Sequence, residues 1–199
     1  HEARGITRQE GKAIFVDGAL PGEKVEYASF RRKPSYELAH LVNVLMPSTA
    51  RVVPLCPHFG VCGGCAMQHM EPSAQVAAKQ RVLEDSLWHI ARVRPETILP
   101  PIHGAPWGYR HRARLGVRKV AKTGEMWIGF HEKRSSYITD MQTCAVLPPH
   151  VSALLLPLRK AIGALSVAER VPQIDIAVGE HCTALLLRLL VPLKPDDEQ

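Results

Sequence analysis

The sequence is poor in aromatic residues and contains no long apolar run. Only 6% of its 199 residues are Phe, Trp or Tyr, so a core must be built mainly from Val, Leu, Ile and Ala. No apolar run approaches the roughly 18 residues that a membrane-spanning helix needs. The 14 Gly and 16 Pro follow no period, which excludes a collagen-like chain. The length suits a globular chain with one or two hydrophobic cores, and the missing apolar run indicates that the chain has no membrane partner.

The sequence also lacks the even cysteine count of a secreted disulfide framework. It has five cysteines, and three of them fall within residues 56–65. Residues 1–5 do not have the pattern of a signal peptide. We therefore expect a cytoplasmic protein in which the cysteine group binds a metal rather than forming disulfides.

The positive charge is concentrated in one segment. The net charge is +6, and residues 104–134 contain eight Lys or Arg against two Asp or Glu, which is +6 for this segment alone. Such a segment indicates a polyanionic partner, most simply nucleic acid. A solvated basic face without a partner is the alternative.

The first 50 residues have the pattern of a small β-domain. Strands are expected at 12–16, 23–31 and 36–46, and Leu20-Pro21-Gly22-Glu23 is typical of a turn. Arg31, Arg32 and Lys33 would form a basic loop tip before Pro34. Several short strands in about 50 residues suit a small barrel.

A helix is expected over residues 73–91, with Ser73 as its N-cap and Pro95 ending it downstream. The spacing of four, three, four and three residues predicts one mainly apolar stripe, formed by Val76, Gln80, Leu83, Leu87 and Ile90.

Residues 110–119 predict a strand with two different faces. The even positions hold Arg110, Arg112, Arg114 and Arg118, whereas the odd positions between His111 and Lys119 are Ala113, Leu115 and Val117. A period of two places the arginines on one face and the apolar row on the other. The arginine face should meet solvent or RNA, although some of its members could pair with Glu125, Glu132 or Asp140.

The remaining segments predict an antiparallel α+β domain. A turn at Thr123-Gly124 precedes the next strand, and Pro148-Pro149 opens a helix to Leu165 that Pro157 should kink or split. Further strands are expected at 126–131, 137–139 and 174–178, and at 184–191, which reads as a more buried partner strand.

The cysteine spacing indicates a metal site. Cys56, Cys62 and Cys65 form a C-x5-C-x2-C motif, and Cys144 is a distant fourth candidate. Thiolates bind zinc and iron–sulfur clusters alike, so the spacing leaves both open. Three sulfurs on one loop and a distant fourth favour a cubane cluster over the paired knuckles of structural zinc.

Two details accompany this motif. Gly63-Gly64 would let the backbone take positive φ and aim amide groups at cluster sulfurs. A zinc site would instead use three cysteines with His58 or His69. Cys182 is expected to be a small buried apolar side chain.

The motif from Cys56 to Cys65, followed by Gln68-His69, resembles the iron–sulfur motif of bacterial 23S ribosomal RNA (uracil-5-)-methyltransferases. Residues 18–23 look like the TRAM domain of that family, an RNA-binding barrel of OB type whose first strand would be missing here. Residues 109–115, 129–130, 138–140 and 144–148 resemble the family's central domain. The resemblance covers most of residues 5–190.

The resemblance implies that Cys56, Cys62, Cys65 and Cys144 ligate a [4Fe–4S] cluster. It also implies ribosomal RNA as the partner and methyl transfer from S-adenosylmethionine to uracil C5, in which a cysteine adds to C6 because C5 alone is a poor nucleophile. The expected RNA-binding residues are Arg31, Arg32, Lys33, Arg110, Arg112, Arg114, Arg118, Lys119, Lys133 and Arg134.

The sequence departs from the family in its catalytic part. It has no glycine-rich cofactor motif and none of the family's catalytic stretches, so we expect no catalytic or S-adenosylmethionine-binding residue and an inactive fragment. The expected parts are a TRAM-like barrel (1–50), a cysteine loop (51–72), a helix and linker (73–103) that packs on the enzyme's own catalytic domain, and a central α+β domain (104–199). Alternatives are a zinc-stabilised nucleic-acid-binding module and a redox iron–sulfur module.

Overall fold

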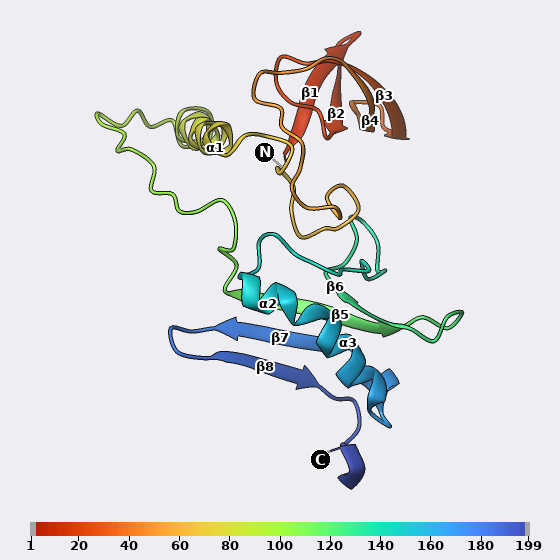
Figure 1. The fold of residues 1–199 in the computed structure, drawn as a ribbon. Coiled ribbons are helices and arrows are strands. Elements are labelled where there is room, and N and C mark those ends of the chain that lie inside the picture. Colours follow the sequence, from red (N-terminus) through yellow and green to blue (C-terminus); the bar gives the residue numbers. More distant parts are fainter. Residues whose placement is uncertain (1–2, 198–199) are drawn as a thin grey trace. The chain divides into compact units, whose positions relative to one another are not determined.

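The computed structural model describes residues 3–197, which divide into two compact units (Figure 1). The first unit comprises the residues up to 54 together with 66–103, and the second comprises 55–65 together with the residues from 104 onward. The cysteine loop is thus part of the same unit as Cys144. Among residues 3–197, no helix is long and apolar enough to cross a membrane.

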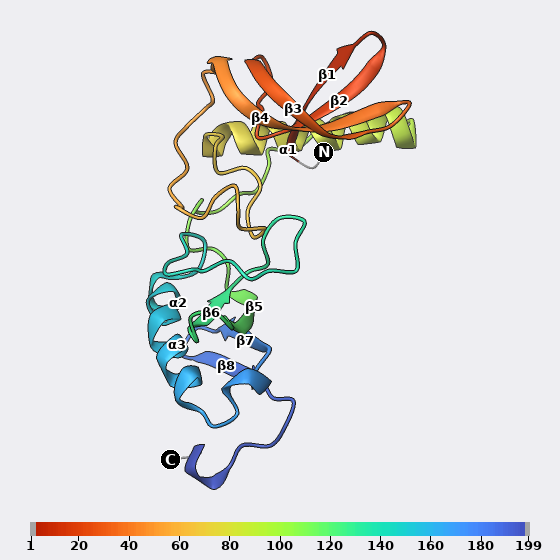
Figure 2. The ribbon, with the colours of Figure 1, turned by 90° about the vertical axis from the view of Figure 1, so that its right-hand side faces the viewer.

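The first unit contains a four-stranded sheet (Figure 2). Its strands are β1 (Arg4–Gln9), β2 (Lys12–Asp17), β3 (Lys24–Arg32) and β4 (Tyr36–Met46), in the order β1-β2-β4-β3. The β2–β4 pair is parallel and the other two pairs are antiparallel. Its small core consists of Ile14, Val16, Ala19 and Ala39.

Strands β2, β3 and β4 confirm the three predicted segments, and β1 is a further strand that was not predicted. Arg31 and Arg32 end β3 instead of lying in a loop, so only Lys33 belongs to the turn before β4. Within residues 3–197 no strand pair closes the sheet, and the barrel remains a prediction.

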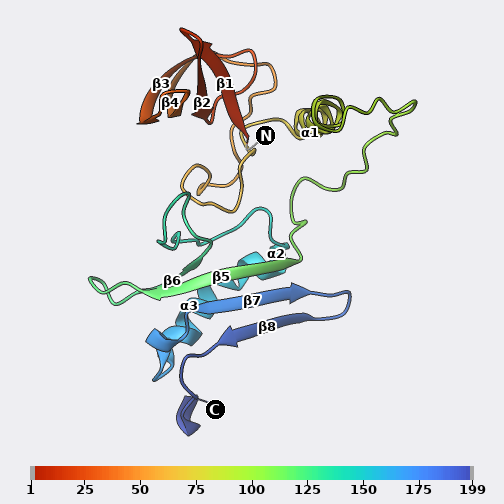
Figure 3. The ribbon, with the colours of Figure 1, turned by 180° about the vertical axis from the view of Figure 1, so that it is seen from behind.

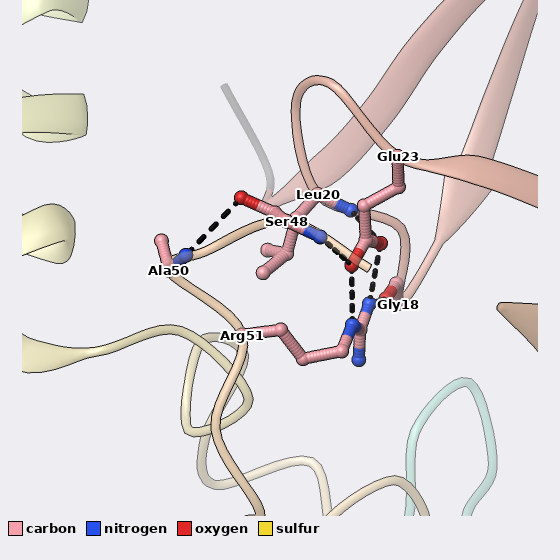
Figure 4. Close-up of polar contacts among 6 residues, drawn as sticks. All are labelled: Gly18, Leu20, Glu23, Ser48, Ala50 and Arg51. Carbon is pink, nitrogen blue, oxygen red and sulfur yellow. Dashed lines mark hydrogen bonds and ion pairs between the residues drawn. The ribbon is translucent and has the colours of Figure 1, made fainter. Parts of the chain in front are cut away.

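A buried ion pair joins this sheet to the segment that follows it (Figure 4). The Glu23 side chain has no exposed surface, and its carboxylate accepts from Arg51 Nε at 2.5 Å and from Arg51 Nη2 at 2.7 Å. The backbone N–H groups of Leu20 and Ser48 also donate to it, while Arg51 donates to the carbonyl of Gly18. The Arg51 hydrogen bond, with this backbone support, lowers the pKa of Glu23 to about 2.

The predicted helix is present but begins and ends differently. Helix α1 spans Pro72–Ser86 and continues as a π-helical turn, η1, over Leu87–Ala91. Its N-cap is Glu71, which accepts from the Ala74 N–H; Ser73 lies inside the helix, so that prediction was wrong. None of its residues is buried, and the predicted stripe is partly exposed, with Leu83 at 54% and Ile90 at 82%.

The second unit contains a four-stranded antiparallel sheet with helices on one face (Figures 1 and 3). The strand order is β6-β5-β7-β8, and its elements are β5 (Arg112–Lys119), β6 (Met126–Gly129), α2 (Pro149–Ala153), α3 (Leu155–Ala164), η2 (Ala168–Arg170), β7 (Gln173–Val178), β8 (Thr183–Arg188) and η3 (Pro195–Asp197). The mixed α+β class is therefore confirmed.

The core of this unit lies between the sheet and the helices. Leu115 and Ile174 on the sheet and Leu155 on α3 have no exposed surface and belong to one apolar cluster. The helix is split between Ala153 and Leu155 because Pro157 lacks the N–H that a continuous helix would donate to the carbonyl of Ala153.

Two strand predictions need correction. Residues 137–139 form only an isolated bridge, between His131 and Ile138. β8 is shorter than the predicted 184–191 and is not the more buried strand. It lies at the edge of the sheet, and its alternate side chains face away from the core, with Leu186 62% exposed.

The buried ion pair predicts a specific dependence on pH. Because the folded pKa of Glu23 lies near 2 and the ordinary value is 4.5, its stabilising effect is full above about pH 4.5 and is lost as the pH falls through about 2. Glu23→Gln should therefore lower the free energy of unfolding by about 3 kcal/mol at pH 7, with a gap that closes in acid. Urea unfolding at several pH values measures this gap. Glu26→Gln, which changes an exposed carboxylate, is the control.

Candidate metal centre and RNA-binding surface

The cysteine loop is held against a hairpin formed by residues 130–139. The Gly63 N–H donates to the carbonyl of His131 at 2.8 Å, and the Lys133 N–H donates to the carbonyl of Val61 at 2.8 Å. Cys62 also forms an antiparallel bridge with Glu132. Backbone hydrogen bonds therefore fix the loop before any side chain or bound group is considered.

All four predicted metal ligands lie in the second unit, and all are free thiols. Cys62 and Cys144 are 8% and 6% exposed and belong to the apolar core, and Cys65 packs against that core. Cys56 and Cys65 are half-buried. Residues far apart in sequence thus reach one region of the fold.

Burial and the neighbouring cysteines both act on the thiols of this group. Burial raises the pKa of Cys62, and Cys65 and Cys56 raise it further, against the hydrogen bond that the Gly64 N–H donates to its sulfur at 3.4 Å. Burial likewise raises the pKa of Cys144, and the same two cysteines add to the effect. The site without a positive group would therefore disfavour several thiolates at once.

The two glycines of the motif allow the hairpin to pack closely against the loop, and they do not adopt a positive φ. Neither Gly63 nor Gly64 has a positive φ, whereas Gly60 does, at 97°, so that expectation was wrong. A Cβ on Gly63 would lie 2.8 Å from the carbonyl oxygen of His131, and one on Gly64 would lie 2.9 Å from the Phe130 ring. The hairpin leaves no room for a side chain at either position.

Arg110 connects the two cysteine segments. Its Nη2 donates to the carbonyl of Gly64 at 3.0 Å, and its backbone N–H donates to the carbonyl of Val146 at 2.9 Å. Its guanidinium carbon lies 5.2 Å from the centre of the Phe130 ring. Arg110 was predicted to bind RNA, but its side chain supports the cysteine loop, a role that the strand pattern alone could not indicate.

The potential donor atoms of this region are mostly sulfur. Four thiols and the buried Nε2 of His58, which has no hydrogen-bond partner among residues 3–197, lie on or next to the loop. In the described part of the chain, no three His, Cys, Asp or Glu side chains are arranged to hold a single metal ion. A four-iron cubane instead takes one thiolate at each iron, so its ligands surround a cluster rather than one atom. His69 lies in the other unit.

The two-faced strand is confirmed by β5. Leu115 and Val117 are buried, whereas Arg112, Arg114 and Arg118 are exposed on the opposite face. Arg114 Nε pairs with Asp175 at 2.9 Å rather than with any predicted carboxylate, because β5 lies beside β7. Most of the arginine charge nevertheless faces away from the core.

The other predicted RNA-binding residues have varied surroundings. Lys119 pairs with Glu169 at 2.9 Å, and Lys133 Nζ lies 5.0 Å from the centre of the Phe59 ring. Arg134 is exposed and has a φ of 58°. Arg31, Arg32 and Lys33 are exposed but belong to the first unit.

Cys182 is exposed, which corrects the expectation that it is a small buried side chain. It lies in the turn between β7 and β8, where its carbonyl accepts from the Gly179 N–H at 2.8 Å. The turn hydrogen bond keeps this residue outside the sheet core. It is therefore a natural control for the four grouped cysteines.

Comparison with known proteins finds curated relatives that match the whole chain. It is 78% identical over 199 residues to the 23S rRNA (uracil(1939)-C(5))-methyltransferase RlmD of Dechloromonas aromatica, covering 100% of this chain and 46% of the relative. Over 196 residues it is 62% identical to the protein of the same name from Bordetella avium, covering 98% and 41%. The chain thus spans less than half the length of these relatives.

One solved structure has a similar fold. The crystal structure of Pyrococcus abyssi tRNA (uracil-54, C5)-methyltransferase in complex with S-adenosyl-L-homocysteine matches with a TM-score of 0.64 and 20% identity. The match covers 99% of this chain and 48% of that one. No protein-family model matches the sequence.

The close packing of the loop predicts the effect of adding one methyl group. Gly63→Ala should destabilise the second unit by about 1–3 kcal/mol, because the Cβ would force the loop away from the His131 carbonyl. Gly104→Ala is the matched control, since a Cβ there meets nothing within 4 Å, and it should change stability by less than about 0.5 kcal/mol. Urea unfolding of both variants measures the difference; equal effects would contradict the packing argument.

Proposed function

We propose that this chain is the RNA-binding and iron–sulfur-binding part of an S-adenosylmethionine-dependent 23S rRNA uracil-C5 methyltransferase. The observation that carries the proposal is that one unit contains the four cysteines, which interact with one another, and an exposed arginine face on β5. The identity of 78% over the whole chain to a protein named as such an enzyme supports it. Ribosomal RNA is then the partner.

In this proposal Cys56, Cys62, Cys65 and Cys144 hold a [4Fe–4S] cluster. The cluster would supply positive iron to a group of thiols whose burial otherwise disfavours ionisation. Because Cys144 is distant in sequence from the loop, the bound group would cross-link the second unit. A structural role follows, since metal sites of this kind contribute folding free energy directly.

The arginine face contributes RNA binding rather than methyl transfer. Arginine guanidinium groups suit phosphates and also stack on unpaired bases. The chain contains no glycine-rich cofactor motif, so S-adenosylmethionine and the nucleophile would be held by other parts of the whole enzyme. The isolated chain would transfer no methyl group.

The exposed stripe of α1 suits a partner surface in the same enzyme. Leu83 and Ile90 are more than half exposed, and such apolar area is unfavourable in water. We propose that the catalytic domain of the intact enzyme packs on this helix.

The ligand set predicts a sharp contrast between two cysteine variants. Cys144→Ala should lose the bound iron and much of the stability of the second unit, whereas Cys182→Ala, in an exposed turn, should keep both. Anaerobic purification with iron and sulfide analysis and a visible spectrum measures this, with about four iron per chain expected for the unaltered protein. A colourless protein with one zinc would overturn the cluster.

The arginine face predicts a change in salt dependence. Arg112→Gln should weaken RNA binding while leaving the iron content unchanged, because this exposed side chain does not support the cysteine loop. The slope of log affinity against log salt should become shallower by up to about 0.7–0.9 for a lost phosphate contact. Fluorescence anisotropy over a salt series tests this. An unchanged affinity and slope would remove Arg112 from the RNA-binding surface.

A further inference from the structure

The row of arginines on β5 is interrupted by a glycine. Arg114, Gly116 and Arg118 share one face, and the absence of a side chain at Gly116 lets the hairpin approach the strand between the two cations. Ile138 of the hairpin occupies the space that a side chain would take: a Cβ built on Gly116 would lie 2.2 Å from Ile138 Cδ1. The arginine face is therefore not flat at its centre.

A cleft of about 300 Å³ opens at this position. Its polar lining comes from Arg114, Arg118, His131, Ser136 and Gln173. The volume is at the lower end of the range of small-ligand sites, which is about 300–1,000 Å³. The cleft can thus receive a group of the size of a single base and not a duplex.

The two arginines of the cleft differ in their availability. Arg114 is oriented by Asp175, whose carboxylate also accepts from Gln173 at 2.9 Å, and the Arg114 hydrogen bond lowers the pKa of Asp175. Arg118 has no carboxylate partner among residues 3–197, and its guanidinium carbon lies 5.8 Å from the ring centre of Tyr137. Tyr137 is 63% exposed. One unneutralised cation and one exposed aromatic ring therefore lie side by side.

The wall of the cleft is held in place by backbone hydrogen bonds. Within the hairpin, the Glu132 N–H donates to the carbonyl of Tyr137 at 3.0 Å, and the Thr139 N–H donates to that of Phe130 at 2.9 Å. The carbonyl of His131 accepts from Gly63 of the cysteine loop. The cleft is consequently pre-formed and linked directly to the cysteine motif.

We propose that this cleft binds a single unpaired nucleotide of the RNA. The proposal rests on the RNA-binding function proposed above and names the part of the RNA that this face selects. Arg118 takes the phosphate, Ser136 and the carbonyl oxygen of Gln173 offer hydrogen bonds to a base edge, and the exposed ring of Tyr137, which contacts Arg118 next to the cleft, offers a stacking surface. A paired base cannot enter, because its edge is occupied and its faces are stacked.

Three variants of the 199-residue chain test the cleft. Ser136→Trp fills it without changing any charge, and Ser136 is exposed, so the larger side chain has room outside the core. Arg118→Gln removes a cation that lines the cleft. Arg112→Gln removes the same charge from the same face but outside the cleft, and is the matched control.

Binding is measured by fluorescence anisotropy with a labelled single-stranded RNA and with the same strand annealed to its complement. Ser136→Trp should weaken binding of the single strand about tenfold and of the duplex less than about twofold. Arg118→Gln should weaken the single strand more than the duplex, whereas Arg112→Gln should weaken both equally. Circular dichroism confirms that each variant is folded.

Two results would overturn the cleft and leave the general function standing. One is Ser136→Trp binding the single strand as the unaltered chain does, while Arg112→Gln still binds less. The other is an equal loss for single strand and duplex in Arg118→Gln. Failure of the unaltered chain to bind either RNA would instead overturn the proposed function itself.

Discussion

The second unit depends on the backbone pairing between the cysteine loop and the hairpin of residues 130–139. Two hydrogen bonds of 2.8 Å and the Cys62–Glu132 bridge hold Val61 to Gly63 against that hairpin. The contact is so close that neither Gly63 nor Gly64 could carry a side chain without displacing it. This pairing uses only backbone groups, and it holds the loop where Cys62 belongs to the apolar core.

Because of this pairing, a group bound to the cysteines would affect the cleft on the arginine face as well as the stability of the unit. The hairpin that supports the cysteine loop on one edge also contributes His131, Ser136 and Ile138 to the cleft on the arginine face. A group that fixes the loop would therefore also fix the wall of the cleft, through one hydrogen bond from Gly63 to His131. In the function proposed above, this gives the iron–sulfur group a physical role that requires no electron transfer.

The sequence predicts what depends on periodicity and misses what depends on tertiary neighbours. The alternation in residues 112–119 predicts β5 and its two faces, and Pro157 predicts the split helix, because both signals are local. Glu71 replaces Ser73 as the N-cap because the helix begins at Pro72, so that the free N–H of Ala74 lies within reach of the Glu71 carboxylate. The partner of Arg114 and the exposure of Cys182 follow from sheet order and turn geometry, which no single segment encodes.

The arginines of one strand show why residue type alone does not define a site. Arg110 lies where the chain approaches the cysteine loop, so its guanidinium is used by the Gly64 carbonyl and the Phe130 ring. Arg114 is partly neutralised by Asp175, while Arg118 keeps its charge beside an exposed ring. Phosphate binding requires a cation that is both exposed and unneutralised. The part of the row that we propose to bind RNA is therefore Arg118 and the cleft beside it, rather than the end near the cysteine loop.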